Sequence, residues 1–128
     1  MPHLAIQHSN NIETERMQTL CNTMHDVLVS TKLFPLGGIR VRAIPCPAFS
    51  IADRHPQNAF VDMVYRIGVG RSAADKKNTG ELLMKAAEAH FAAELSSPHF
   101  ALSLEIVEID SDYSWKTNPM HARSKGQS

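Results

Sequence analysis

The order strand, long helix, strand is predicted twice along this 128-residue chain, and it constrains the fold more than any other feature. The first set consists of a strand at 2–8, a helix at 12–31 and a strand at 39–44. The second consists of a strand at 59–69, a helix at 73–95 and a strand at 100–109. Helical connections of this length permit parallel pairing of the strands they join, with a right-handed crossover. We therefore expect an α/β fold: two consecutive β-α-β units that form a four-stranded sheet with two helices on one face.

The spacing of apolar residues supports these elements. In the first helix they recur every three or four residues, at Met17, Leu20, Cys21, Met24, Val27 and Leu28. In the third strand they alternate, at Val61, Met63, Tyr65 and Ile67, and the last strand alternates at Leu102, Leu104 and Ile106. The segment IRVRAI also alternates, which places Arg40 and Arg42 on one face of the second strand and Val41 on the other.

The length of the chain suits a single domain over 1–128, with pseudo-repeat halves at about 1–46 and 59–110 and a tail at 111–128. The segment 45–58 is irregular and is interpreted as a connection. The tail is polar from Ser114 onward and ends in SKGQS, which we expect to fray. Because both helices cover the same face of the sheet, the other face needs a cover, and copies of the same chain are the simplest one.

The charge and hydropathy of the chain argue against nucleic acid and membranes as partners. Thirteen basic residues balance thirteen acidic ones, so no overall field favours nucleic acid or an anionic membrane, although a small anionic substrate remains compatible. No apolar stretch is long enough to span a membrane, and the start MPHLAIQHSNN lacks the basic region of a signal peptide. We expect a cytoplasmic protein in which Cys21 and Cys46 are buried, unpaired side chains.

Metal and nucleotide sites are not predicted. The seven histidines show no pair spaced as two ligands on one helix turn, and no Cys-x-x-Cys accompanies them. The turn GVGRS lacks the lysine and the spacing of a phosphate-binding loop.

Pro2 is the candidate catalytic residue. Removal of Met1 would expose a secondary amine, and an α-amino group has a pKa near 8, which nearby cations or burial lower further. Arg40, Arg42 and Arg71 are the candidate partners, since guanidinium groups bind carboxylates and stay charged. The plainer interpretation is that these arginines are solvated or paired with acidic side chains, and a proline after Met1 is a weak signal by itself.

Short stretches along nearly the whole chain carry a family pattern. They are Met1-Pro2-His3, Ser9, Asn11 and Ile12, FPLGGIRVR from Phe34, Ala52-Asp53, Ala59-Phe60-Val61, IGVGRS from Ile67, HFAAEL from His90, ALSLEIVEI from Ala101, and Lys116, Asn118 and His121. In this order and spacing they resemble the 5-carboxymethyl-2-hydroxymuconate isomerases of the tautomerase superfamily.

The resemblance implies an α+β tautomerase-type fold, a homotrimer, and a role in the breakdown of homoprotocatechuate that needs no cofactor. The implied reaction converts 5-carboxymethyl-2-hydroxymuconate, a dienol of the dicarboxylate type, into its conjugated 2-oxo isomer. Pro2 would take the hydroxyl proton and return a proton to carbon. Arg40 and Arg71 would bind a carboxylate or the 2-oxo group and stabilise negative charge, while Arg42 would bind substrate in a less defined way. Some of these arginines would serve the Pro2 of a neighbouring subunit.

Two features keep alternatives open. Gln7 stands where some family members are expected to carry an acidic residue, which favours a related tautomerase acting on another small 2-oxo or enol acid. If Met1 is retained, the Pro2 nitrogen is an amide without basicity. The chain would then be a non-catalytic trimer that binds small anions.

Overall fold

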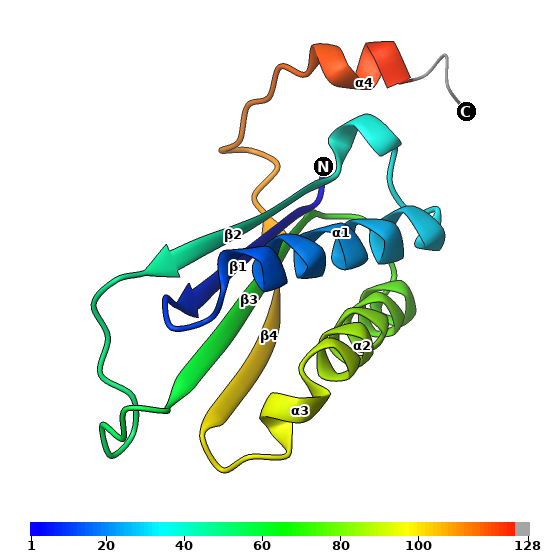
Figure 1. The fold of residues 1–128 in the computed structure, drawn as a ribbon. Helices are drawn as coiled ribbons and strands as arrows, with labels where there is room; N and C mark the ends of the chain where they lie inside the picture. The colour runs from blue at the N-terminus through cyan, green and yellow to red at the C-terminus, as the bar shows by residue number, and fades with distance from the viewer. Residues whose placement is uncertain (125–128) are drawn as a thin grey trace.

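The computed structural model describes residues 1–124. Four strands form its sheet: β1 (His3–Ser9), β2 (Arg40–Cys46), β3 (Ala59–Gly68) and β4 (Phe100–Ile109). The helical elements are α1 (Thr14–Thr31), the 3-10 turn η1 (Leu36–Gly38), α2 (Ala73–His90), α3 (Ala92–Leu95) and α4 (Pro119–Ser124), as Figure 1 shows. Within residues 1–124, no helix is long and apolar enough to cross a membrane.

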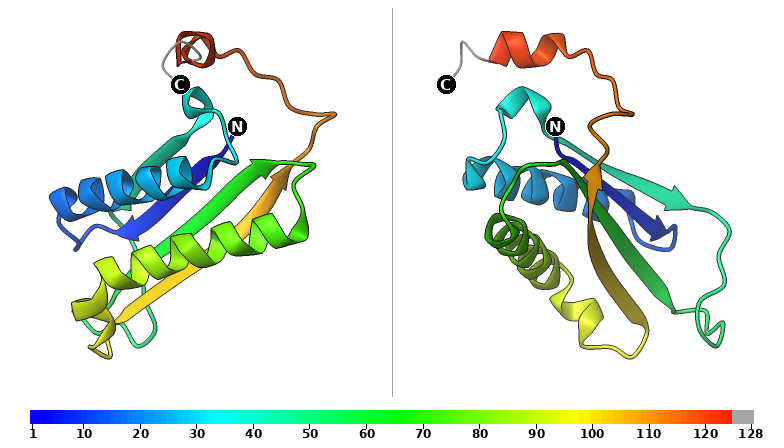
Figure 2. Two further views of the ribbon diagram at one scale, coloured as in Figure 1. Left: turned by 90° about the vertical axis from the view of Figure 1, so that its right-hand side faces the viewer. Right: turned by 180° about the vertical axis from the view of Figure 1, so that it is seen from behind.

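The sheet is mixed, with the strand order β2-β1-β3-β4. The strands of each β-α-β unit pair in parallel, β1 with β2 and β3 with β4, as the long helical connections predict. The two units join through an antiparallel pair, β1 with β3. Both long helices lie on the same side of the sheet, as Figure 1 and the view from behind in Figure 2 show.

The core lies between the helices and the sheet. Alternate strand residues and the apolar stripe of α1 fill it, and the predicted buried positions of β3 are exposed by 1% or less. On α2 three of the four buried residues, Thr79, Gly80 and Ala87, are small, and a Cβ at Gly80 would meet Ile106 Cδ1 at 3.0 Å. The lack of a side chain at Gly80 therefore lets α2 lie close against β4.

The helix predicted over 73–95 is two helices, so its length was predicted wrongly. Phe91 separates α2 from α3 with φ −103° and ψ 27°, which interrupts the helical backbone. Its ring is fully buried and its centroid lies 5.0 Å from that of Phe100. The break turns this ring into the core, and tertiary packing outweighs the local preference for a continuous helix.

Other boundaries differ by a few residues. The first helix begins at Thr14 rather than at residue 12. Strand β2 continues past its predicted end at residue 44 and through Pro45 to Cys46. An edge strand tolerates proline because one row of its backbone groups has no ladder partner, and β2 is an edge strand.

The tail after β4 folds back over the N-terminal end of the chain (Figure 1). Asn118 Nδ2 donates a hydrogen bond to the Gly37 carbonyl at 2.7 Å. A Cβ at Gly37 would lie 2.5 Å from His121 Cα, so glycine permits this close contact between η1 and α4. The segment SKGQS was expected to fray, but its first residue, Ser124, is the last residue of α4. Residues 125–128 lie outside the described part of the chain.

Candidate active site

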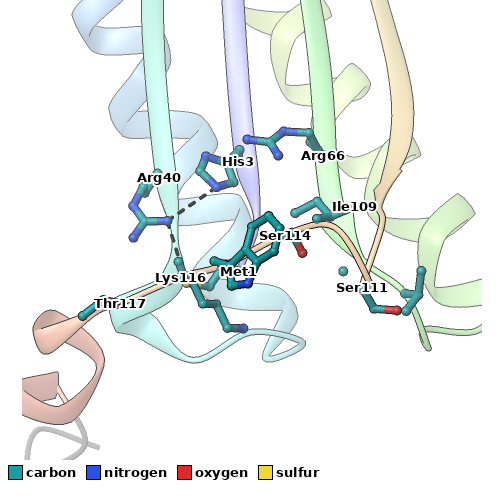
Figure 3. A pocket seen from close by; sticks show the side chains of 12 residues that line it. Met1, His3, Arg40, Arg66, Ile109, Ser111, Ser114, Lys116 and Thr117 are labelled. Atoms are coloured by element: carbon teal, nitrogen blue, oxygen red, sulfur yellow. Dashed lines mark hydrogen bonds between the residues drawn. The ribbon is translucent and has the colours of Figure 1, made fainter.

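A cavity of about 630 Å³ lies at one end of the sheet, where β1 and β2 begin and β3 and β4 end. Figure 3 shows the side chains around it. The strands contribute His3, Arg40 and Arg66, and the tail contributes Trp115 and Lys116 among others. The strands belong to both halves of the chain, so neither half forms this site alone.

The N-terminus lies in this cavity. Pro2 is buried, and its carbonyl accepts a hydrogen bond from the Arg40 backbone N–H at 3.1 Å. Met1 lines the cavity, and its sulfur lies 3.8 Å from Arg40 Nη1 and 3.7 Å from Asn118 Nδ2. Burial first, and then the charges of Lys116, Arg71 and Arg40, lower the pKa of the terminal amine below its usual value. An amine in this place is therefore biased toward its neutral, basic form.

His3 is surrounded by guanidinium groups. Its Nε2 lies 3.5 Å from Arg40 Nη1, and its Nδ1 lies 3.2 Å from Arg42 Nη1. Burial, followed by the charges of Arg66, Arg42 and Arg40, lowers the pKa of His3 to about 4. The ring is therefore neutral near pH 7.

The arginines singled out from the sequence occupy three different environments. Arg40 lines the cavity next to Met1. Arg42 is exposed beside His3 and lines a smaller hollow of about 340 Å³ between α1 and β2. Arg71 lies outside the cavity lining: its Nη2 donates to the Leu33 carbonyl at 3.2 Å, and its Cζ lies 4.4 Å from the centroid of the Phe34 ring. Its charge nevertheless acts on the terminal amine.

Arg66 and Lys116 line the cavity but were not singled out as site residues from the sequence. The alternation of the third strand does place Arg66 opposite its apolar face, which is a signal that could have been used. Its position beside His3, however, depends on the antiparallel register of β1 and β3. Lys116 reaches the cavity because Asn118 holds the tail against η1, a contact between residues far apart in the sequence.

The positive charges around the cavity lack acidic partners. In residues 1–124 the ion pairs are Arg16–Glu94, His25–Asp26 and Lys76–Glu108, and none of them involves Arg40, Arg66 or Lys116. The same part of the chain holds no group of three or more side chains suited to a metal ion. Unpaired cations around a partly enclosed cavity are suited to an anion with several charges.

Comparison with known proteins gives the family. A sequence profile described as 5-carboxymethyl-2-hydroxymuconate isomerase matches residues 2–124. The 5-carboxymethyl-2-hydroxymuconate Delta-isomerase of Escherichia coli is 36% identical over 126 residues, which cover 98% of this chain and 100% of the relative. This chain belongs to the 5-carboxymethyl-2-hydroxymuconate isomerase family.

Solved structures agree with this assignment. A 5-carboxymethyl-2-hydroxymuconate isomerase from Deinococcus radiodurans R1 superposes with a TM-score of 0.89 and 39% identity, over 95% of this chain and 92% of that one. A more distant protein, the wild-type W0 fused 4-OT symmetric trimer, shares the fold with a TM-score of 0.67 and 16% identity, over 90% and 93% of the two chains. The fold seen here is therefore shared well beyond the family.

Proposed function

We propose that this chain is an isomerase that converts 5-carboxymethyl-2-hydroxymuconate into its 2-oxo isomer, with the Pro2 amine as the base once Met1 is removed. Membership of the family and the full-length similarity to the Escherichia coli enzyme support the reaction. One structural observation carries the role of Pro2. The start of the chain lies in a cavity lined by unpaired cations, where burial and charge lower the pKa of an amine.

In the proposed mechanism the neutral Pro2 amine takes the proton of the 2-hydroxyl group. The oxygen electron pair forms the C=O bond, the adjacent double bonds shift, and the dienolate charge moves toward C5. The Pro2 ammonium then returns the proton to C5, so no atom is gained or lost overall. The neutral form of the base is favoured by the same burial and charges that lower the pKa of the Met1 amine.

In this proposal the three arginines have different roles in binding the substrate and stabilising its negative charge. Arg40 lines the cavity and is placed to bind the carboxylate or the oxygen next to the reacting centre. Arg71 stabilises the developing negative charge through its field, which already reaches the terminal amine. Arg42 contributes positive charge from beside His3 and binds substrate less directly.

We also propose that the enzyme is a homotrimer in the cytoplasm. The face of the sheet without helices carries half-buried Phe60 and Val64 and the exposed Ile44 and Val107, which copies of the chain would cover. The symmetric trimer among the fold neighbours offers a precedent for assembly. Cys21 and Cys46 are both free thiols, which suits a reducing compartment.

The test is the ketonisation of 5-carboxymethyl-2-hydroxymuconate by wild-type protein and by Pro2→Ala. We expect the variant to lose about 100-fold or more in kcat, since general base catalysis contributes that much and alanine offers only a primary amine. Pro98→Ala, in the exposed loop before β4, is the matched control and should retain full activity. Undiminished activity of Pro2→Ala would contradict the role of the proline.

The pH profile gives an independent measurement of the same base. Because the surroundings lower the pKa of an amine at this place, kcat/KM should rise with pH and level off below pH 8, the ordinary value for such a group. Since the charges of Lys116, Arg71 and Arg40 contribute to this lowering, Lys116→Gln should move the rise to higher pH. If the pH dependence of kcat/KM were the same in Lys116→Gln and wild type, the charge of Lys116 would not act on the base.

A second candidate is an anion-binding protein without activity, which the comparisons do not favour but a retained Met1 would require. Met1 lines the cavity and its sulfur contacts Arg40 and Asn118, so a chain that retains it would keep the Pro2 nitrogen as an amide and leave less room beside it. The intact mass of the purified protein decides between the two. Loss of Met1 supports the enzyme, and retention in an inactive protein supports the binding role.

A further inference from the structure

We propose that Arg66, with His3 beside it, binds a substrate carboxylate at the end of the molecule remote from the reacting hydroxyl group. This inference rests on the proposed function and adds a residue that determines specificity. The observation behind it is that β3 places an unpaired guanidinium directly across from the residue that follows Pro2.

The register of the sheet defines the position of Arg66. Arg66 on β3 pairs with His3 on β1, and His3 pairs in turn with Arg40 on β2. Side chains directly opposite one another on neighbouring strands have Cβ atoms about 5 Å apart. All three residues line the cavity, and Figure 3 shows their side chains on its wall. The three strands therefore present a row of two arginines with a histidine between them.

The positive charges around the cavity lower the pKa values of two groups, the terminal amine and His3. Lys116, Arg71 and Arg40 lower the pKa of the terminal amine, whereas Arg66, Arg42 and Arg40 lower that of His3. Arg40 belongs to both sets, and Arg66 belongs only to the set around His3. Arg40, beside Met1, and Arg66 lie on the strands to either side of His3, so the site has a reacting end near the amine and Arg40 and a second positive end at Arg66.

At the positive end of the cavity near Arg66, the guanidinium N–H groups outnumber the hydrogen-bond acceptors around them. A neutral imidazole has one acceptor nitrogen, yet Arg40 faces one ring nitrogen of His3 and Arg42 faces the other. Only one of these two arginines can donate to the ring. Arg66 has no hydrogen bond or ion pair from its side chain within residues 1–124. A carboxylate supplies the missing acceptors, and it matches the planar fork of a guanidinium.

The proposed substrate has the matching charge distribution. It carries one carboxylate beside the 2-hydroxyl group and further carboxylates at the C5 end of the chain. The Pro2 amine must reach both the hydroxyl oxygen and C5, so in this pose C5 lies beside the amine and the carboxylates attached beyond C5 extend along the cavity toward Arg66. A substrate without a carboxylate at that end would gain nothing from Arg66.

The test compares Arg66→Gln with wild-type protein on two dienols. One is 2-hydroxymuconate, which has a carboxylate at each end, and the other is 2-hydroxypenta-2,4-dienoate, which has only the carboxylate beside the hydroxyl group. We expect kcat/KM on the diacid to fall about 10- to 100-fold, mostly through KM, because a charge-assisted pair is lost. On the monoacid the fall should be less than about threefold.

Two further variants serve as controls. Arg54→Gln removes one positive charge from the exposed connection between β2 and β3, far from the cavity along the strands, and should leave both substrates unchanged. Arg66→Lys keeps the charge but not the fork, so it should recover part of the preference for the diacid. Thermal unfolding and gel filtration of each variant separate a loss of contact from a loss of structure.

Three outcomes would overturn the inference. Equal losses on both substrates would assign Arg66 to the reacting end or to the fold, and no loss on either would show that it does not contact substrate. Both results leave the proposed function intact, because the wild-type enzyme is still active. A wild-type protein that has lost Met1 but turns over neither of these dienols nor 5-carboxymethyl-2-hydroxymuconate would reject the proposed function, and this inference with it.

Discussion

The two faces of the sheet differ sharply, although the same strands form both. On the face under α1 and α2, Leu4, Ile6, Met63 and Tyr65 are fully buried in an apolar core. On the opposite face, the alternate residues include His3, Arg40, Arg66 and Glu105 and stay partly or largely accessible within one chain. The covered face holds the chain together, and the open face carries the cations of the cavity and the apolar side chains that the proposed trimer would cover.

A substitution on the covered face should have the largest effect. Met63→Lys places an unpaired charge in a position that is 0% exposed, which we expect to destabilise the chain by about 3–5 kcal/mol. That is a large share of the stability of a small domain. Circular dichroism and thermal unfolding should show little folded protein at 37 °C. A well-folded variant would contradict the assignment of this face to the core.

The neighbouring residue provides the matched substitution on the open face. Val64→Lys should leave the secondary structure intact, since Val64 pairs across the strands with Ala5 and Glu105 and a lysine there can reach the carboxylate. The proposed trimer should dissociate, because the charge would lie in the surface between subunits. Gel filtration measures the change in size. If this variant unfolded as Met63→Lys is expected to, the proposed difference in burial between the two faces would be wrong.

The tail brings Lys116 to the cavity and is held there by its contact with η1. Gly37→Ala adds a Cβ that would meet the backbone of α4 at 2.5 Å, so we expect the tail to detach and take Lys116 away from the cavity. Activity on the dienols should fall by about tenfold, the effect of one lost charged contact, with little change in thermal stability. Asn118→Ala removes the hydrogen bond to the Gly37 carbonyl and should have a similar, weaker effect. Full activity in both variants would show that the tail is dispensable.

The smallest expected effect is a pH dependence of stability from the open face. The pKa of His3 is lowered to about 4 in the folded chain, compared with an ordinary value of 6.5. The unfolded chain therefore binds more protons between these values, and stability declines as the pH falls from about 6.5 to about 4. Solvent screens this half-buried ring, so we expect a loss of no more than about 1 kcal/mol. Denaturant unfolding of wild type and His3→Asn at several pH values measures it, and identical curves would contradict it.

Local patterns account for most of the fold. Alternation in the strands and the three- to four-residue spacing in α1 depend on contacts with a single neighbouring layer, so the sequence shows them directly. The same alternation placed Arg40 and Arg42 together on one face of β2. The break at Phe91 escaped prediction because the residues around it favour a helix, and only the space beside Phe100 makes burial of the ring favourable.

The sequence by itself determined the number and type of the main elements, the covered face of the sheet, the family pattern, and the candidates Pro2 and Arg40. Only the tertiary structure decided that the two halves join through β1 and β3, which places Arg66 beside His3. Only the tertiary structure brought Lys116 over the cavity, through the docking of α4 on η1. Both arrangements depend on contacts between distant segments, and no local periodicity records the register or the partner of such contacts.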